Sequence, residues 1–144
     1  MKNLLYILVL STVALASCDL ESSDNGDLDG YWLLERVDTL ATGGTLQCRG
    51  DQRFWSFQSH LMQLTQGGTG ADAMSFRFQR QGDELTLDNP CVFNRQKGDT
   101  PITDVEVVQP YGVNALTEKW SFRRLTSDHM ELESGMLHLY FRKY

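Results

Sequence analysis

The side chains of this 144-residue sequence that could carry out chemistry are three cysteines and three histidines. His129, Glu131 and His138 stand close together near the C-terminus, and metal ions use imidazole and carboxylate ligands. Cys48 could act as a nucleophile if an imidazole such as His60 lay beside it. Neither set has the local context of an established site, and the acidic residues are scattered rather than paired. The sequence therefore predicts no enzyme, no metal site and no cofactor.

The third cysteine, Cys18, follows a segment with the features of an export signal. An apolar run over residues 4–16 comes after a short start containing Lys2. The run is too short to span a bilayer, which takes about 20 apolar residues, but it suits a signal peptide. Leu15-Ala16-Ser17-Cys18 resembles a bacterial lipobox, in which the cysteine is lipidated and becomes the first mature residue. An ordinary signal peptide is the alternative. We predict that residues 1–17 are removed and that Cys18 carries a lipid anchor.

Cys48 and Cys91 remain as an even pair in an exported protein. Disulfides form in oxidising compartments, so the pair favours a bridge between the two residues. Two separately buried thiols are the alternative. We predict the disulfide.

An acidic segment follows the first cysteine. Residues 18–28 are polar and lack periodicity, which predicts a lipidated cysteine and a flexible tether before a domain over residues 29–144. The whole chain has a formal net charge of −6, and loss of Lys2 with the signal peptide makes it more negative. Nucleic-acid binding depends on clustered Lys and Arg, so the charge argues against it. Membrane contact is expected through the lipid alone.

Short runs with alternating apolar residues account for most of the expected domain. The predicted strands are 31–37, 53–58, 61–64, 74–79, 84–87, 118–124, 128–133 and 137–144. Residues 53–64 could also form one strand with a bulge at 59–60. The proline-containing stretch 89–112 predicts irregular structure, with a short helix or edge strand near 103–108. About eight or nine antiparallel strands without a long helix predict an all-β fold, either an up-and-down barrel or a tight sandwich.

The apolar positions of these strands predict a core filled by side chains rather than a cavity. The last hairpin is expected to turn at Ser134-Gly135, which would place Glu131 opposite His138 on a wet outer face. The predicted inward residues are Trp32, Met74, Phe76, Phe78, Leu85, Leu87, Trp120, Phe122, Met130, Leu132, Leu137, Leu139 and Phe141.

Gly30 and Trp32 open the first strand in a Gly-x-Trp pattern that resembles the first motif of the lipocalins. Together with the last strand 137–144, it makes most of the mature chain similar to small lipocalin-like lipoproteins of Bacteroidota. The resemblance implies that Trp32 closes one end of a barrel. In lipocalins an Arg near the last strand covers this Trp, and Arg142 or Arg124 could take that place. Lipoprotein barrels of the META or lysozyme-inhibitor type would also fit.

The resemblance implies a lipid-anchored binding protein of the outer membrane, facing the periplasm or exposed on the cell surface. One function is binding of a small hydrophobic or amphipathic ligand at the barrel mouth, near the loops 66–70 and 94–99. The alternative is an interaction or inhibitor module that contacts an envelope protein or glycan with a filled barrel.

The lipobox predicts that membrane association depends on Cys18. Cys18→Ser should move the protein from the membrane fraction to the soluble fraction, or leave it unprocessed, because the lipid has no attachment site. Fractionation and immunoblotting measure this. Unchanged membrane association of the variant would exclude Cys18 as the anchor.

Overall fold

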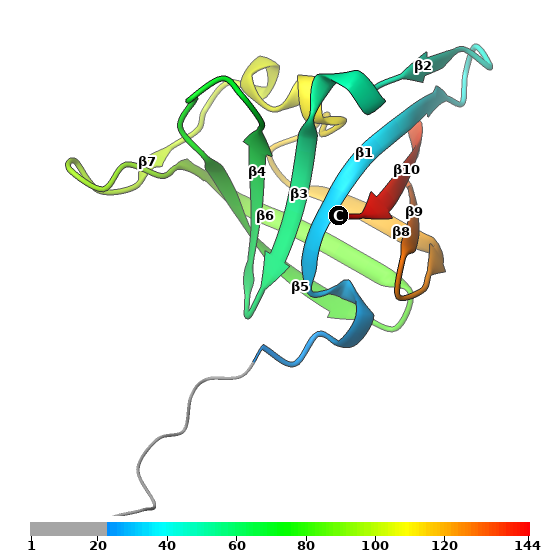
Figure 1. Cartoon of the computed structure of the whole chain (residues 1–144), viewed down its shortest axis with the longest axis horizontal. Helices are drawn as coiled ribbons and strands as arrows, with labels where there is room; N and C mark the ends of the chain where they lie inside the picture. Colours follow the sequence, from blue (N-terminus) through cyan, green and yellow to red (C-terminus); the bar gives the residue numbers. More distant parts are fainter. Residues whose placement is uncertain (1–22) are drawn as a thin grey trace, which may run out of the picture.

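The computed structural model describes residues 23–144, and the signal peptide 1–17 and Cys18 lie outside the described residues. Eight antiparallel strands form a closed barrel, as Figure 1 shows. They are β1 (Gly30–Thr39), β3 (Arg53–Gln58), β4 (Leu61–Gln66), β5 (Met74–Gln81), β6 (Glu84–Val92), β8 (Glu118–Leu125), β9 (His129–Glu133) and β10 (Leu137–Lys143). The prediction of an all-β up-and-down barrel is confirmed.

Pairing of β1 with β10 closes the barrel, and the remaining order is β10-β9-β8-β6-β5-β4-β3-β1. Two short strands lie outside this circle: β2 (Thr45–Gln47) pairs with β1, and β7 (Thr100–Pro101) pairs with β6. Between β7 and β8 the chain forms two 3-10 turns, η3 (Val105–Val107) and η4 (Gln109–Tyr111), in the stretch expected to be irregular. No helix within residues 23–144 is long and apolar enough to cross a membrane.

The hairpin turns set the register of the strands. A two-residue turn at Ser59-His60 separates β3 from β4, so these are two strands rather than one bulged strand. The predicted register of the last hairpin is wrong by two residues, because Leu139 lies opposite Leu132 and His138 opposite Glu133. The Ser134 hydroxyl accepts hydrogen bonds from the backbone N–H groups of Met136 and Leu137, which lengthens the turn. A shift of two leaves every side chain on its predicted face.

One contiguous cluster of side chains fills the barrel. Of the predicted inward residues, Phe122 and Leu137 are partly buried against this cluster and the others are buried. Several further core members were not predicted from the sequence, among them Leu28, Trp55, Phe57, Met62, Leu64, Val108, Tyr111 and Val113. Three fully buried tryptophans, Trp32, Trp55 and Trp120, occupy much of the space that a ligand would need.

The N-terminal segment closes one end of the barrel. The short turn η1 (Gly26–Leu28) inserts Leu28, which is 0% exposed, and Trp32 Nε1 donates a 2.8 Å hydrogen bond to the Leu28 carbonyl. Residues 23–28 are therefore part of the folded domain, and the flexible tether predicted over 18–28 was too long. A single apolar residue in a polar run gave no periodic signal.

A lysine, rather than Arg142 or Arg124, covers Trp32. Lys143 lies opposite Trp32 in the β1–β10 register, with its Nζ 4.8 Å from the indole ring and 2.8 Å from the Asp27 carbonyl. Gly30 lies beneath this lysine, and a Cβ there would make only an ordinary contact of 3.4 Å with Lys143 Cε. The φ of +116° at Gly30 is what favours glycine.

The chain between β7 and β8 covers the opposite end. Val108, Tyr111 and Val113 are buried, and the Tyr111 carbonyl accepts a 2.9 Å hydrogen bond from Trp55 Nε1. Gly112, at φ +89°, packs so closely that a Cβ would lie 3.0 Å from Leu139. Both ends of the barrel are thus covered by side chains of the chain itself.

The predicted disulfide is absent from this structure, in which Cys48 and Cys91 are free thiols. Cys48 is buried beside the end of β2, whereas Cys91 lies on β6, which is separated from β1 by β3, β4 and β5. An even number of cysteines carries no information about their distance across a barrel.

Trp32 is expected to determine stability. Trp32→Ala should cost about 3–5 kcal/mol, because the substitution leaves a cavity and removes the hydrogen bond to Leu28. Thermal and urea unfolding measure the loss. The matched control is Tyr31→Ala at the exposed neighbouring position, where a loss of about 1 kcal/mol or less is expected. Similar losses in the two variants would contradict the assignment of Trp32 as the closing residue.

Candidate functional site

The histidine cluster expected on the last hairpin does not converge on a metal site. His129 Nδ1 lies 3.0 Å from Asp128, while His138 Nε2 lies 3.2 Å from Glu131 and its Nδ1 3.6 Å from Glu133. No group of three or more His, Cys, Asp or Glu residues within 23–144 is arranged to hold a metal ion. His138 instead pairs across strands with Glu131 and Glu133 on the outside of the sheet, and His129 pairs with its neighbour in the chain.

His138 also belongs to a stack of side chains over β1 and β10. Its ring lies parallel to Tyr140 at 4.3 Å, and the Arg36 guanidinium lies 3.7 Å from the Tyr140 ring centre on the other side. Arg36 also pairs with Asp38 at 3.1 Å. Burial opposes ionisation of Asp38, but hydrogen bonds from Thr45 and Tyr140 and the Arg36 charge outweigh it and lower the pKa of the carboxyl.

Further ion pairs continue this surface, which we call the paired face. It consists of the outward side chains of β8, β9 and β10 and of residues 35–39 of β1. Glu35 pairs with Arg49 at 2.9 Å and with Arg142 at 3.0 Å, and Glu133 pairs with Arg123 at 2.8 Å. Most charges of the paired face are thus matched within the described residues, with Arg124 on β8 as an exception, which leaves few charged groups available for a ligand.

Cys48 and His60 cannot act together as a thiol catalyst. His60 lies in the β3–β4 turn at the end closed by Leu28, while Cys48 precedes β3 at the opposite end. Burial, reinforced by the charge of Asp51, raises the pKa of the Cys48 thiol, which disfavours the reactive thiolate.

The two loops expected to flank a ligand do lie at the same end of the barrel. Loop 66–70 joins β4 to β5, loop 94–99 joins β6 to β7, and the Phe93 N–H donates a 2.8 Å hydrogen bond to the Ala73 carbonyl between them. A hollow of about 580 Å³ adjoins them, lined by residues 71–73, 93–96 and Gln63. It lies on the outside, because Val108 and Tyr111 cover the barrel mouth.

A different surface combines exposed aromatic rings with uncharged polar groups. We call it the Tyr31 face. It consists of the outward side chains of β3, β4 and residues 30–34 of β1, together with Tyr144. Cross-strand pairing aligns Tyr31 with Ser56 and Ser56 with Gln63, and in the next row Leu33 with Phe54 and Phe54 with Thr65. In the row beyond Tyr31, Gln58 lies opposite Leu61. None of these eight strand positions carries a charge.

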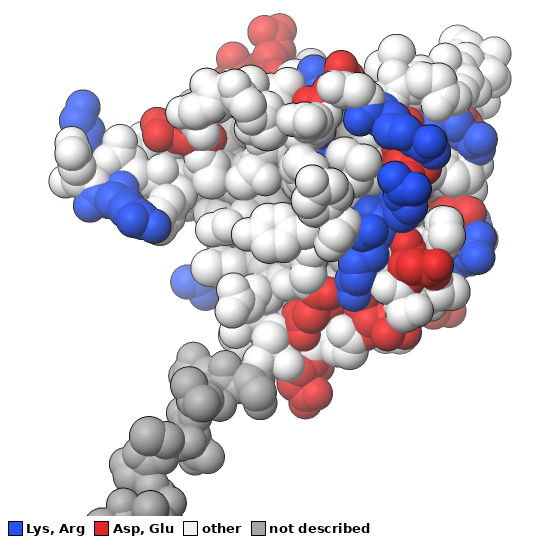
Figure 2. Space-filling view, in the orientation of Figure 1, with Lys and Arg blue, Asp and Glu red and all other residues white. Residues whose placement is uncertain are grey.

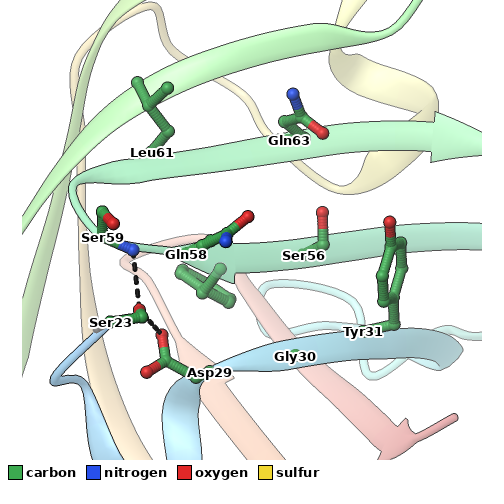
Figure 3. Close-up of a pocket in the computed structure, with 10 residues that line it drawn as sticks. Ser23, Asp29, Gly30, Tyr31, Ser56, Gln58, Ser59, Leu61 and Gln63 are labelled. Carbon is green, nitrogen blue, oxygen red and sulfur yellow. Dashed lines mark hydrogen bonds between the residues drawn. The ribbon is translucent and has the colours of Figure 1, made fainter. Parts of the chain in front are cut away.

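Two hollows flank Tyr31 on this face. The lower hollow, of about 470 Å³, has Ser23, Asp29, Ser56, Gln58 and Gln63 in its lining, and Figure 3 shows the side chains of Tyr31, Ser56 and Gln63 projecting to the same side of the sheet. The upper hollow, of about 390 Å³, lies between Tyr31, Phe54, Thr65 and Tyr144. Both are within the size range of ligand pockets, about 300–1,000 Å³.

The aromatic side of the face is preformed. The rings of Phe54 and Tyr144 pack edge to face with centres 5.1 Å apart, and Leu33 beside them is only 7% exposed although its strand position faces outward. Tyr31 and Tyr144 remain 56% and 86% exposed.

Asp29 fixes the lower border of the face. It accepts hydrogen bonds from the Ser23 hydroxyl at 2.7 Å and from Asn25 Nδ2 at 2.8 Å, and Ser23 in turn accepts one from the Ser59 N–H. Burial opposes ionisation of Asp29, but these hydrogen bonds and the charge of Lys143 outweigh it and lower the pKa of the carboxyl. This clasp, made of Ser23, Asn25, Asp29 and Ser59, attaches the N-terminal segment to the β3–β4 turn.

The two faces differ in how their polar groups are used. Figure 2 shows charged side chains gathered on one side of the view, over β1 and β10, while the surface over β3 and β4 is largely uncharged. Within the described part of the chain, no side-chain hydrogen bond involves Ser56, Gln58, Gln63 or Thr65, or the Tyr31 hydroxyl. The Tyr31 face therefore presents unoccupied donors and acceptors.

A family model described as "Lipocalin-like domain" matches residues 13–144. The chain belongs to this family. A comparison of this lipocalin-like domain with curated proteins finds no match.

Solved structures with the same fold come from several bacteria. A lipocalin-like protein from Bacteroides uniformis has a TM-score of 0.64 and 19% identity, over 83% of this chain and 100% of that one. An uncharacterized protein from Bacteroides eggerthii has a TM-score of 0.61 and 14% identity, over 81% and 99% of the two chains. A protein from Burkholderia xenovorans has a TM-score of 0.52 and 14% identity, over 81% and 83%. At these identities the likeness concerns the fold alone, and a lipocalin-like barrel is typical of binding proteins.

The Tyr31 face was not predicted from the sequence. The predicted strands contain its outward residues, but apolar alternation identifies the inward positions and does not distinguish uncharged outward residues from other surface residues. Tyr144 joins the face only because the barrel closes between β1 and β10.

The clasp should contribute stability that depends on pH. A lowered folded-state pKa means that the Asp29 carboxylate stabilises the fold above the ordinary value of 3.8, and that this contribution is lost as the pH falls through the lowered pKa. Asp29→Asn should therefore reduce the melting temperature at pH 7, and the difference from the wild type should shrink in strong acid. Asp24→Asn, at an exposed neighbouring carboxyl, is the control and should have no effect at either pH. A pH-independent difference for Asp29→Asn would contradict this role.

Proposed function

We propose that this lipocalin-like domain is a lipid-anchored binding module of the cell envelope that holds its target on the Tyr31 face. The observation that carries the proposal is the contrast between the filled barrel and the unoccupied polar groups and hollows of this face. Among the two functions expected from the sequence, this supports the interaction module. A small hydrophobic ligand at the barrel mouth has less support, because Val108 and Tyr111 cover that end.

The anchor would hold the domain close to a membrane. Four residues separate Cys18 from Ser23, where the clasp begins, and a fully extended chain of this length spans roughly 17 Å. The end closed by Leu28 would then face the lipid, and the Tyr31 face would stand along the side of the barrel. We place the protein at the outer membrane, facing the periplasm or the cell surface.

The first test asks whether ligands enter the barrel. The protein with Cys18→Ser is titrated with oleate, which does not absorb tryptophan emission, while that emission is recorded. All three tryptophans lie in the core, so the proposal predicts no saturable change in their emission. A stoichiometric change in tryptophan emission would show an interior ligand site and contradict the proposal.

The second test asks which outer face is used. A photo-crosslinking residue replaces Ser56 on the Tyr31 face or, as the matched control, Lys119 on the paired face, in the full chain in intact cells. Irradiation should give a discrete product from position 56 and none from position 119. Products from position 119 alone would contradict the proposal and indicate that the target binds to the paired face.

A further inference from the structure

We infer that the Tyr31 face binds a neutral oligosaccharide chain, with one sugar ring on Tyr31 and its neighbours in the two flanking hollows. This inference rests on the proposed function and names the ligand class of the same surface.

The charge of the face favours a neutral ligand. Asp29 is engaged by Ser23 and Asn25 at the lower border, and Arg142 beside Leu33 is paired with Glu35. Arg77 on β5 lies opposite Leu61, which lines the lower hollow, but Arg77 itself lines neither hollow. A charged ligand seated within the hollows would lose water without finding an unengaged counter-ion among the residues that line them, which is unfavourable.

The exposed rings favour a ligand with flat apolar faces. Tyr31 lines both hollows and is 56% exposed, so its ring forms the ridge between them. A tyrosine offers an apolar ring and a polar hydroxyl, and the C–H face of a pyranose can pack on such a ring while its hydroxyls stay hydrated. Tyr144, held against Phe54, gives a second ring in the upper hollow.

The polar groups suit sugar hydroxyls, which both donate and accept hydrogen bonds. The Gln63 and Gln58 amides and the Ser56 hydroxyl each offer a donor and an acceptor, and they line the lower hollow beside Tyr31. No other side chain of residues 23–144 uses them.

An extended peptide fits this surface less well. Addition of a peptide strand needs an exposed sheet edge. Strand β3 is paired with β1 and β4, and β4 is paired with β3 and β5, so the backbone groups under the face are already bonded. A ligand must therefore be recognised by side chains alone.

The test is a titration of the chain with Cys18→Ser against hexasaccharides of glucose, mannose, xylose and N-acetylglucosamine, with polygalacturonate and heparin as anionic probes. At least one neutral probe should bind with an affinity that is insensitive to salt, because no ion pair forms. Tyr31→Ala and Gln63→Ala should each weaken that affinity about tenfold or more, and Tyr31→Phe, which keeps the ring, should remain within about threefold.

Leu46→Ala is the matched control, since Leu46 on β2 is 60% exposed but remote from the face, and it should leave the affinity unchanged. Circular-dichroism melting verifies that each variant is folded. Absence of binding to every neutral probe, binding of anionic probes alone, or affinities insensitive to Tyr31→Ala and Gln63→Ala would each overturn the saccharide assignment. Crosslinking from position 56 in cells would then still support the proposed function, whereas its loss would remove both.

Discussion

The pairing of β1 with β10 is the interaction on which the rest of the structure depends. It joins the first and last strands of the domain, and without it both would present unpaired backbone groups at an open edge. The same pairing brings Lys143 over Trp32 and so completes the closed end of the barrel. It also carries Tyr144 to Phe54, which completes the aromatic part of the Tyr31 face. Closure thus builds the interior and the candidate binding surface in one step.

The filled interior has a consequence for where binding can occur. Three tryptophans and the aromatic and aliphatic residues around them form one contiguous buried cluster inside the barrel. Leu28 and Tyr111 are buried at its opposite ends. We therefore propose binding on the outside, where the paired face and the Tyr31 face differ in one respect. On the paired face Arg36, Glu35 and Glu133 are each paired with an opposite charge, whereas Gln58 and Gln63 have no partner among the described side chains.

Strand alternation was sufficient to predict the fold and the inward residues, because side-chain direction in a strand has a period of two. The last hairpin shows the limit of that signal: a register error of two residues preserves the faces, so the apolar pattern could not detect it. Leu28 was missed because it is a single apolar residue in a polar run, and Tyr111 because the apolar residues of its proline-containing stretch do not alternate. The disulfide was wrong because pairing of cysteines depends on distance across the barrel, which alternation does not report. Lys143 could replace the expected arginine over Trp32 because a cation above an aromatic ring satisfies the same electrostatic requirement.

The clasp at Ser23 connects the anchor to the surface. Because Ser23 accepts from the Ser59 N–H and donates to Asp29, the N-terminal segment ends at the border of the lower hollow rather than at a remote point of the barrel. A lipid on Cys18 would consequently limit how the hollow can be oriented relative to the membrane, since only residues 19–22 intervene. If the end closed by Leu28 faces the lipid, Gln58 and Leu61 would lie nearer to it than Gln66. A polymer lying across Tyr31, Ser56 and Gln63 would follow a row of cross-strand neighbours. This uncharged row suits a long ligand, because no ion pair between described residues interrupts it.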